Sequence, residues 1–361
     1  MRVFNFNGGP AALPLPVLRE VQEEFLDWHG TGMSIVENSH RAKEVAAMAT
    51  EAQNLLLELL GLSSEQWAVA FCQGGASLQF AMVPLNFAPQ GTVCDYIDTG
   101  LWSSKAFQEA KICGSGARFA ASSKDADYTF IPSQYDYSEK PQYVYLTSNN
   151  TVRGTQWPSF PTGAPGPLVA DVSSEFLSRP LDLTDFGLIF AGAQKNVAPA
   201  GLTIAVIRRS FAITGQTGLP HMLDYRTFID NDSMYNTPPV FAIYVAGLVF
   251  KWLKNTVGGL KAMEAKNKAK AALLYSAIDN SGGFYSGTAQ VGSRSPMNVT
   301  FRLSDSSLEK PFQEEAKKEG LVGLGGHRSV GGLRASLYNA LDLDAVEALT
   351  GFMAEFKRKK G

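Results

Sequence analysis

Short apolar runs that alternate with helical segments constrain the fold of this chain more than any other feature of its sequence. The runs contain few polar residues, so they do not alternate between a buried and a solvated face. The predicted strands cover residues 68–72, 93–97, 143–147, 168–170, 188–191 and 203–207. Such strands are covered on both faces, as in a mostly parallel sheet flanked by helices. The pattern therefore predicts an α/β fold.

Helical spacing of apolar residues predicts the elements that connect and follow these strands. Helices are expected at residues 43–60, 77–86, 102–111, 240–253 and 260–278, and Gly61 is the expected cap of the first. The lysines of 260–278 are interpreted as a solvated outer face. After Gly282 the chain predicts strand 297–303, helix 308–319, strand 333–337 and helix 344–357. This last part indicates a smaller α+β domain.

Composition excludes several functional classes. The 361 residues carry a net charge of −2, which gives no electrostatic case for binding nucleic acid or an anionic membrane. Three scattered cysteines suit neither a disulfide framework nor a metal site, so no metal is expected. The amino terminus has no apolar signal region, and the longest apolar run, 240–250, is shorter than the ~18 residues of a membrane span. We expect a buried helix there and a cytoplasmic protein.

A single lysine lies between two predicted core strands. Residues 188–191 form one apolar run and residues 202–207 the next, with Lys195 among small residues between them. Lysine is rarely buried without a partner. A solvated loop lysine would explain the position. So would a lysine whose pKa is lowered by desolvation, which would form a Schiff base as a nucleophilic amine. This stretch alone does not separate the two interpretations.

An aspartate closes the predicted strand before the lysine. Asp171 follows residues 168–170, and the carboxyl end of a parallel strand lies at the ligand-binding edge of such a sheet. The carboxylate could cap the next turn through Ser173 and Ser174. It could instead hold the pyridine nitrogen of pyridoxal phosphate protonated, which keeps that cofactor an electron sink.

Three further segments could contact such a cofactor. Gly74-Gly75-Ala76-Ser77 lies between a strand and a helix, where backbone N–H groups and the helix dipole favour a phosphate. Trp102 follows another strand and could form an aromatic platform, although most tryptophans are core or interface residues. Asn236 and Thr237 offer polar groups before helix 240–253, where a role at the helix start would explain them nearly as well.

Two histidine–arginine pairs suggest an anion site. Only four histidines occur, and His40-Arg41 and His327-Arg328 each place one directly before an arginine. Arg334 follows the second pair within a glycine-rich stretch. Arginine binds carboxylate and phosphate bidentately, so these cations predict an anionic substrate. Structural ion pairs are the alternative.

Together these segments resemble the phosphoserine aminotransferase family, a class V aminotransferase group among the fold-type I pyridoxal phosphate enzymes. The order and spacing of the motifs match along almost the whole chain. The motifs are Ser39-His40-Arg41, Asp171-Val172-Ser173-Ser174, Ala191-Gly192-Ala193-Gln194-Lys195-Asn196, Asn236-Thr237-Pro238-Pro239, Gly326-His327-Arg328 and Gly332-Leu333-Arg334. One departure is Ser77, where some members carry an arginine close to the phosphates. A second is Gly8, where some members carry a serine.

The resemblance implies a sheet of the seven-stranded type, a large cofactor domain at residues 16–258, and a small domain from residues 1–15 and 259–361. It also implies a homodimer with shared active sites. Lys195 would carry pyridoxal phosphate as a Schiff base, one per subunit, with Asp171 at the pyridine nitrogen. The other cofactor contacts would be Ala76, Ser77, Trp102, Thr151 and Gln194, with Asn236 and Thr237 from the partner subunit. His40, Arg41, His327, Arg328 and Arg334 would bind the substrate.

The implied reaction moves an amino group from L-glutamate to 3-phosphohydroxypyruvate and gives O-phospho-L-serine and 2-oxoglutarate, a step of serine biosynthesis. The resemblance leaves open whether 4-phosphohydroxythreonine, a substrate of some relatives in vitamin B6 synthesis, also reacts. The alternatives are another reaction on the same fold, such as cysteine desulfuration or elimination, and a non-catalytic scaffold. A desulfurase needs a mobile nucleophilic cysteine, and none of Cys72, Cys94 and Cys113 lies in a suitable loop.

Overall fold

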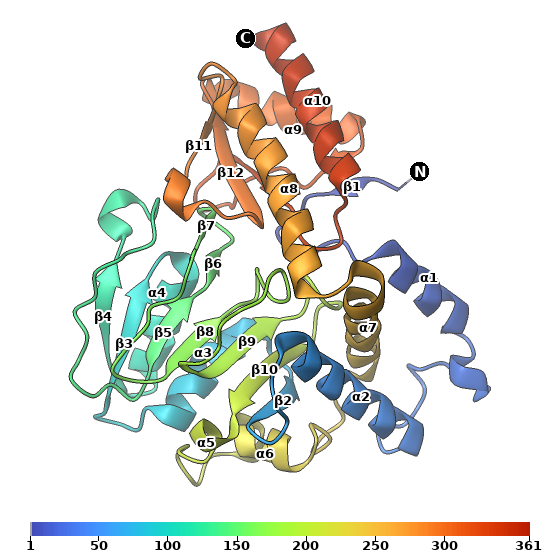
Figure 1. Ribbon diagram of the computed structural model, residues 1–361, viewed down its shortest axis with the longest axis vertical. Coiled ribbons are helices and arrows are strands. Elements are labelled where there is room, and N and C mark those ends of the chain that lie inside the picture. Colours follow the sequence, from blue (N-terminus) through green and yellow to red (C-terminus); the bar gives the residue numbers. More distant parts are fainter. Residues whose placement is uncertain (1) are drawn as a thin grey trace.

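A seven-stranded sheet forms the centre of the computed structural model, which describes residues 2–361. Its strands are β2 (Trp67–Cys72), β3 (Val93–Asp98), β4 (Gly116–Ser122), β5 (Val144–Thr147), β8 (Leu168–Asp171), β9 (Phe186–Gly192) and β10 (Thr203–Arg208). They lie in the order β2-β10-β9-β8-β5-β3-β4 (Figure 1). Only β10 runs antiparallel to its neighbours, and the other pairs are parallel. The predicted mostly parallel α/β sheet is confirmed, with β4 as an additional edge strand.

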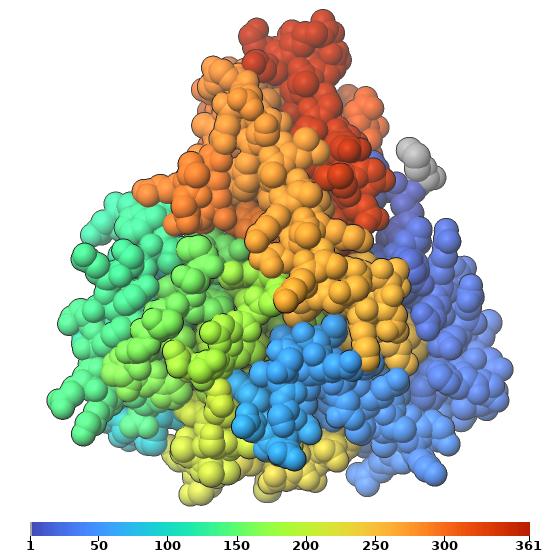
Figure 2. Space-filling view, viewed as in Figure 1, coloured from blue at the N-terminus to red at the C-terminus, as the bar shows by residue number. Residues whose placement is uncertain are grey.

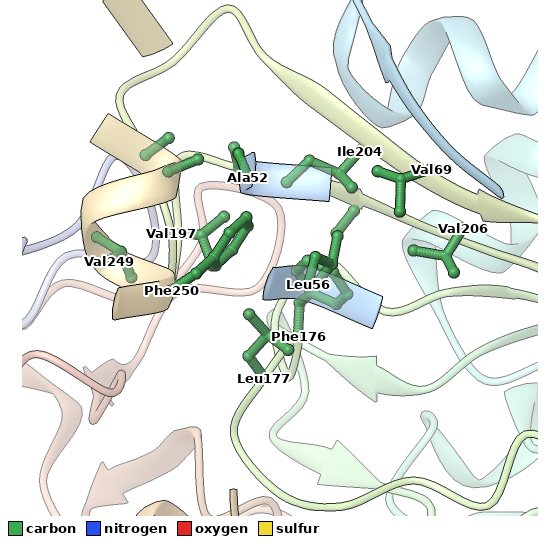
Figure 3. Close-up of a cluster of buried hydrophobic side chains, with 14 of the residues drawn as sticks. Ala52, Leu56, Val69, Phe176, Leu177, Val197, Ile204, Val206, Val249 and Phe250 are labelled. Atoms are coloured by element: carbon green, nitrogen blue, oxygen red, sulfur yellow. The ribbon is translucent and has the colours of Figure 1, made fainter. Parts of the chain in front are cut away.

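Helices cover both faces of this sheet. One face packs against α3 (Gly75–Phe87), α4 (Leu101–Ile112) and α6 (Tyr225–Asp230), and the other against α2 (Lys43–Leu60) and α7 (Val240–Lys251). Side chains of β2 alternate between the two cores: Val69 and Phe71 belong to the α2/α7 side, Ala70 and Cys72 to the α3 side. Figure 3 shows the α2/α7 side. Burial on both faces explains why the strands read as continuous apolar runs.

The carboxyl-terminal segment forms its own core above the sheet (Figures 1 and 2, orange to red). A three-stranded sheet of β11 (Tyr285–Gly287), β12 (Asn298–Leu303) and β14 (Leu333–Ser336) packs with α8 (Leu260–Asp279), α9 (Glu309–Lys318) and α10 (Leu343–Lys360). From the other end of the chain, β1 (Phe4–Asn5) pairs in parallel with β13 (Leu321–Val322). The amino-terminal arm therefore joins the carboxyl-terminal core.

The remaining elements connect these layers. They are α1 (Leu15–Glu24), α5 (Arg209–Ala212), the strand pair β6 (Asn149–Asn150) and β7 (Thr155–Gln156), the 3₁₀ turns η1 (Trp28–Gly30), η2 (Lys124–Ala126), η3 (His221–Leu223), η5 (Val291–Ser293) and η6 (Ser306–Leu308), and the π-helical turn η4 (Trp252–Val257). The predicted cap of α2 is confirmed, because Gly61 adopts the left-handed conformation with φ 67°.

The apolar helix α7 with its continuation η4 is long and apolar enough to cross a membrane by length and composition alone. However, 61% of this stretch is buried inside the fold, and α7 packs along α2 in the main core. Burial by protein satisfies the apolar surface of the helix. The prediction of a buried core helix is confirmed.

The interpretation of α8 as having only solvated lysines is wrong at one position. Lys270 is buried, and its Nζ donates to the carbonyl oxygens of Leu337, Tyr338 and Leu341 at 2.8–3.0 Å. The carbonyls belong to the turn that follows β14. A buried ammonium needs such acceptors for all its protons. Lys270 therefore fixes the chain between β14 and α10, which helical periodicity could not show.

Replacing Lys270 with methionine is expected to lower the free energy of unfolding by about 2–4 kcal/mol, because buried carbonyls lose a charged donor. Urea denaturation at a fixed cofactor concentration would measure the change. Lys268→Met is the matched control, since Lys268 is exposed on the same helix and, within residues 2–361, its one salt bridge is with Glu264. We expect the control to change stability by less than about 0.5 kcal/mol. Equal effects of both variants would contradict the structural role of Lys270.

Candidate active site

Lys195 lies in the turn between β9 and β10, as predicted. The turn is closed by a hydrogen bond from Ala193 N to Leu202 O at 3.0 Å. Val197, two residues after the lysine, points into the main core beside Phe250 of α7 (Figure 3). The backbone on both sides of the lysine is therefore held by the sheet and by the core. This rigid support presents the side chain at the carboxyl end of the parallel strands.

The amine of Lys195 is desolvated and hydrogen-bonded. Its Nζ donates to Thr151 Oγ1 at 2.8 Å. Desolvation lowers the pKa of Lys195 to about 8; Asp171 opposes this shift, and the positive charge of Arg334 adds to it. A much larger fraction of the amine is neutral near physiological pH than in an ordinary lysine. Lys195 therefore has the properties of a nucleophile and of a proton carrier.

Asp171 ends β8, the strand next to β9. Its side chain is buried, and Oδ1 accepts a hydrogen bond from Ser173 N at 2.9 Å. Burial raises the pKa of Asp171, while the positive charge of Lys195 lowers it. The cap of the turn that the sequence suggested is thus present. It occupies one carboxylate oxygen, and the acid still faces the same site as the lysine.

Arg334 of β14 reaches the same place from the carboxyl-terminal core. Its Nη1 donates to Thr151 O at 3.1 Å, and its Nε is buried without a partner among residues 2–361. Arginine with an unpaired donor suits a carboxylate. The structure therefore brings Lys195, Asp171, Thr151 and Arg334 together from four separate elements.

The amino-terminal arm closes the site over the lysine. A Cβ at Gly9, which has φ +125°, would lie 3.1 Å from Lys195 Cγ, and one at Gly8 would lie 2.5 Å from Arg334 Nη2. Ala11 N donates to Gln194 O at 2.9 Å, which fastens the arm beside the lysine. These glycines allow the arm backbone to approach two functional side chains closely.

The loop before α3 is suited to a phosphate. The first N–H groups of α3, including those of Ala76 and Ser77, have no carbonyl partner within the helix, and its first turn has no acidic residue. Gln73 Nε2 and Asn236 Oδ1 are buried there without partners among the described residues. Asn236 lies next to this loop of its own chain, with Nδ2 3.5 Å from Gln73 Oε1.

Trp102 lies in the first turn of α4 and also has a buried polar atom without a partner among the described residues. Its Nε1 is buried without a partner within residues 2–361. A desolvated lysine, a buried acid, an indole and a helix start with free N–H groups match the aldehyde, pyridine nitrogen, ring and phosphate of pyridoxal phosphate. The residues present therefore fit this cofactor.

The family model for class-V aminotransferases matches residues 3–349. The chain belongs to the class-V aminotransferase family. A phosphoserine aminotransferase of Desulfosudis oleivorans is 53% identical over 360 residues, covering 100% of this chain and 99% of that protein. The solved phosphoserine aminotransferase of Bacillus circulans subsp. alkalophilus is 49% identical, with a TM-score of 0.97 and coverage of 100% and 99%. The pyridoxal phosphate-bound enzyme of Trichomonas vaginalis is 39% identical, with a TM-score of 0.93 and coverage of 98% and 100%.

Within this class-V aminotransferase one of the two histidine–arginine pairs is coupled to Arg334. His327 and Arg328 lie on the loop that precedes β14, near Arg334; desolvation, Arg334 and Arg328 lower the pKa of His327. The described part of the chain contains no hydrogen bond or salt bridge between this pair and His40 or Arg41. His40 Nε2 is itself buried without a partner there. The electrostatic contacts of the described residues therefore connect His327 and Arg328 with Arg334, and they give no such connection for His40 and Arg41.

Sequence reasoning missed three residues of this aminotransferase site. Gly8 was noted only as a departure from some family members, and Gly9 was not singled out. Tyr338 was not singled out, although its hydroxyl donates to Gly8 O at 3.0 Å and accepts from Asn298 Nδ2 at 3.2 Å. The consecutive glycines were the available signal for the arm. No local pattern marks the buried tyrosine.

Proposed function

We propose that the protein is a pyridoxal phosphate-dependent phosphoserine aminotransferase. It moves an amino group from L-glutamate to 3-phosphohydroxypyruvate and forms O-phospho-L-serine and 2-oxoglutarate. The observation that carries this proposal is the Lys195 amine, with a pKa of about 8, bonded to Thr151 and coupled to the charges of Asp171 and Arg334. Relatives of this name, about half identical over the full chain, support the substrates. A cytoplasmic location fits such an enzyme.

The cofactor would be held by residues that already surround the lysine. Lys195 would bind it covalently and Asp171 would face the pyridine nitrogen. The further contacts would be Trp102 on the ring, Thr151 and Gln194 at the polar edge, and Ala76 and Ser77 at the phosphate. Asn236 and Thr237 of a partner subunit would complete the phosphate site. When bound, pyridoxal phosphate supplies an electron sink for the charge that forms when the substrate Cα loses its proton.

The side chains of this chain supply binding and proton transfer. Lys195 Nζ removes the Cα proton of the amino donor and, in the second half-reaction, supplies the Cα proton of the amino acid that forms; its lowered pKa permits both near neutral pH. Arg334 binds the α-carboxylate through its guanidinium, whose Nε has no partner among residues 2–361. His327 and Arg328, at the mouth of the site, bind the substrate phosphate. The arm at Gly8 and Gly9 excludes water from the lysine.

A half-reaction assay tests the proposal. Glutamate alone should release about one equivalent of 2-oxoglutarate per cofactor-loaded subunit and then stop, because the amino group stays on the enzyme until an acceptor arrives. Added 3-phosphohydroxypyruvate should restart release. Hydroxypyruvate, which lacks the phosphate, should react at least about 100-fold more slowly, since the site cations lose their anion. Equal rates for the two acceptors would overturn the assignment. 4-Phosphohydroxythreonine is itself an amino acid, so it tests the second substrate by replacing glutamate as the amino donor; it should then release about one equivalent of its 2-oxo acid per cofactor-loaded subunit.

The cysteines argue against the desulfurase alternative. Cys72 and Cys94 are buried in the core, and burial raises their pKa values to about 12 and about 11. Desolvation also raises the pKa of Cys113, which lies at the end of α4. None of these thiols could act as a mobile thiolate. A non-catalytic scaffold would release no 2-oxoglutarate from glutamate.

The chain would work as a homodimer of two-domain subunits. We place the large domain at residues 16–258 and the small domain at residues 1–15 and 259–361, which matches the separate core and the pairing of β1 with β13. Exposed apolar side chains gather in the segment before His40: Phe25, Leu26, Met33 and Val36 are 40–82% exposed. A second subunit would cover them and receive His40 and Arg41 beside its own His327.

Subunit mixing tests the shared sites. Lys195→Ala and Arg41→Ala homodimers should each be nearly inactive. If Arg41 acts in the partner's site, each mixed dimer contains one site that carries both defects and one that carries neither. Random mixing of equal amounts should then restore roughly one quarter of the wild-type activity, from half the dimers with one intact site each. No recovery after verified subunit exchange would place Arg41 in the site of its own chain.

A further inference from the structure

Lys105 lies one helical turn after Trp102 on α4. Its Nζ is 5.1 Å from the centre of the Trp102 ring, so the ammonium is held close to the indole. The side chain is exposed, and no carboxylate within residues 2–361 forms a salt bridge with it. Lys105 was not among the predicted site residues, because nothing in the local sequence distinguishes it from other surface lysines.

The charge of Lys105 acts on the substrate-binding loop. Desolvation, Arg334, Arg328 and Lys105, in that order, lower the pKa of His327. Lys105 on α4 and the loop before β14 therefore share one positive field, although they are more than 200 positions apart in the chain. Cations that repel one another at short range lower the stability of the free protein. Such an arrangement is suited to a multiply charged anion.

Neighbouring arginines show that this excess of charge is local. Arg153 and Arg302 line a cavity beneath the same loop, and each pairs with an acid, Arg153 with Asp127 and Arg302 with Glu309. By contrast, Arg328 and Arg334 form no salt bridge within the described residues, as is true of Lys105. Lys105, Arg328 and Arg334 are thus unpaired within residues 2–361, while Arg153 and Arg302 are neutralised.

We propose that Lys105 is a specificity-determining residue whose ammonium binds the phosphate of the substrate together with His327 and Arg328. This inference rests on the proposed function and adds a residue to it. The contact with Trp102 keeps the flexible lysine stem beside the cofactor platform, so the ammonium is positioned before the substrate arrives. A phosphate dianion at the loop would complete the charge that this group of cations leaves unbalanced.

Variants of the cofactor-loaded enzyme test the role of the charge. Lys105→Gln and Lys105→Met should lower kcat/KM for 3-phosphohydroxypyruvate about tenfold, the usual effect of one partly solvated charge-assisted bond. Lys105→Arg should keep most of the activity. The rate of 2-oxoglutarate release from glutamate should change less than about twofold. The affinity of the holoenzyme for inorganic phosphate, measured by calorimetry, should fall by a factor similar to that of kcat/KM.

Lys111→Gln is the matched control. Lys111 lies on the same helix with its Nζ 5.6 Å from the centre of the Phe107 ring, a contact of the same kind. Six residues further along α4, it is about 9 Å from Lys105 along the helix axis. We expect the control to leave unchanged the kcat/KM for 3-phosphohydroxypyruvate, the rate of 2-oxoglutarate release from glutamate, and the affinity for inorganic phosphate.

Three outcomes would overturn the proposal. Unchanged kinetics in Lys105→Gln would show that the ammonium does not meet the phosphate. Equal losses with glutamate and 3-phosphohydroxypyruvate would show that Lys105 only supports Trp102. A loss in Lys111→Gln equal to that in Lys105→Gln would indicate a general charge effect. These outcomes differ from a failure of the proposed function itself. That failure would appear in the unmodified enzyme as equal rates for phosphorylated and unphosphorylated acceptors.

Discussion

Replacing Lys195 with alanine is expected to lower kcat by about 10⁴-fold or more while the protein stays folded. The variant loses both the covalent anchor and the group that moves the Cα proton; a positioned acid–base group alone contributes roughly 10²–10⁴-fold. Steady-state release of 2-oxoglutarate would measure the loss. The turn itself should survive, because Ala193 and Val197 hold its backbone from both sides. Thermal unfolding of the apo-protein should shift by no more than a few degrees.

The variant Lys195→Arg distinguishes the proton transfer by Lys195 from the effect of its positive charge. Arginine keeps a cation at this position, but its pKa is too high to accept and return a proton near neutral pH. We therefore expect it to be as inactive as the alanine variant. Substantial activity in Lys195→Arg would show that the site needs only a positive charge, and would assign the proton transfer to another residue.

Replacing Asp171 with asparagine is expected to lower kcat by about 10²–10³-fold, the usual effect of removing one oriented charge or donor from a desolvated site. Asparagine has nearly the same shape, and its side-chain oxygen can still accept the hydrogen bond from Ser173 N. The folded structure should be kept, because a buried carboxylate with a raised pKa adds little stability. Single-turnover rates with glutamate would measure the loss. Unchanged rates would contradict its position at the pyridine nitrogen.

For Asp171→Asn we also expect a change in the pH dependence of cofactor uptake, which can be measured without turnover. The pKa of Lys195 is about 8, so the amine of the apo-protein is mostly neutral above that pH, and the rate of cofactor uptake should rise through a midpoint near 8. Asp171 raises this pKa because its negative charge stabilises the ammonium. In Asp171→Asn the midpoint should therefore move to lower pH. A shift to higher pH would contradict the coupling between the two residues.

Much of the fold follows from the sequence, because burial on both faces leaves a simple signature in the strands. The apolar runs predicted β2, β3, β5, β8, β9 and β10 within a few residues. The edge strand β4 was not predicted, because Gly116–Ser122 is only partly buried and mixes small and polar residues. Lys270 was misassigned because spacing along α8 cannot show that carbonyls of a distant turn converge on one ammonium.

The active site was predictable where the sheet alone positions it. Asp171 ends β8 and Lys195 follows β9; the two strands are neighbours in the sheet, so the shared carboxyl edge brings the residues together. Gly8 could not be predicted in this way. Its need for a small residue depends on the guanidinium of Arg334, which reaches it from the other end of the chain. In the proposed homodimer, the place of His40 and Arg41 in the site would depend on a second subunit, about which the local sequence carries no information.

The pairing of β1 with β13 has a consequence for how the protein is made. Phe4 lies opposite Leu321, and the arm at Gly8 is held by Tyr338. The strands of the large sheet, all within residues 67–208, can pair while the ribosome is still translating the second half. The arm cannot dock until nearly the whole chain has emerged. A nascent chain therefore forms its scaffold early, but its lysine pocket closes, and retains a cofactor, only close to termination.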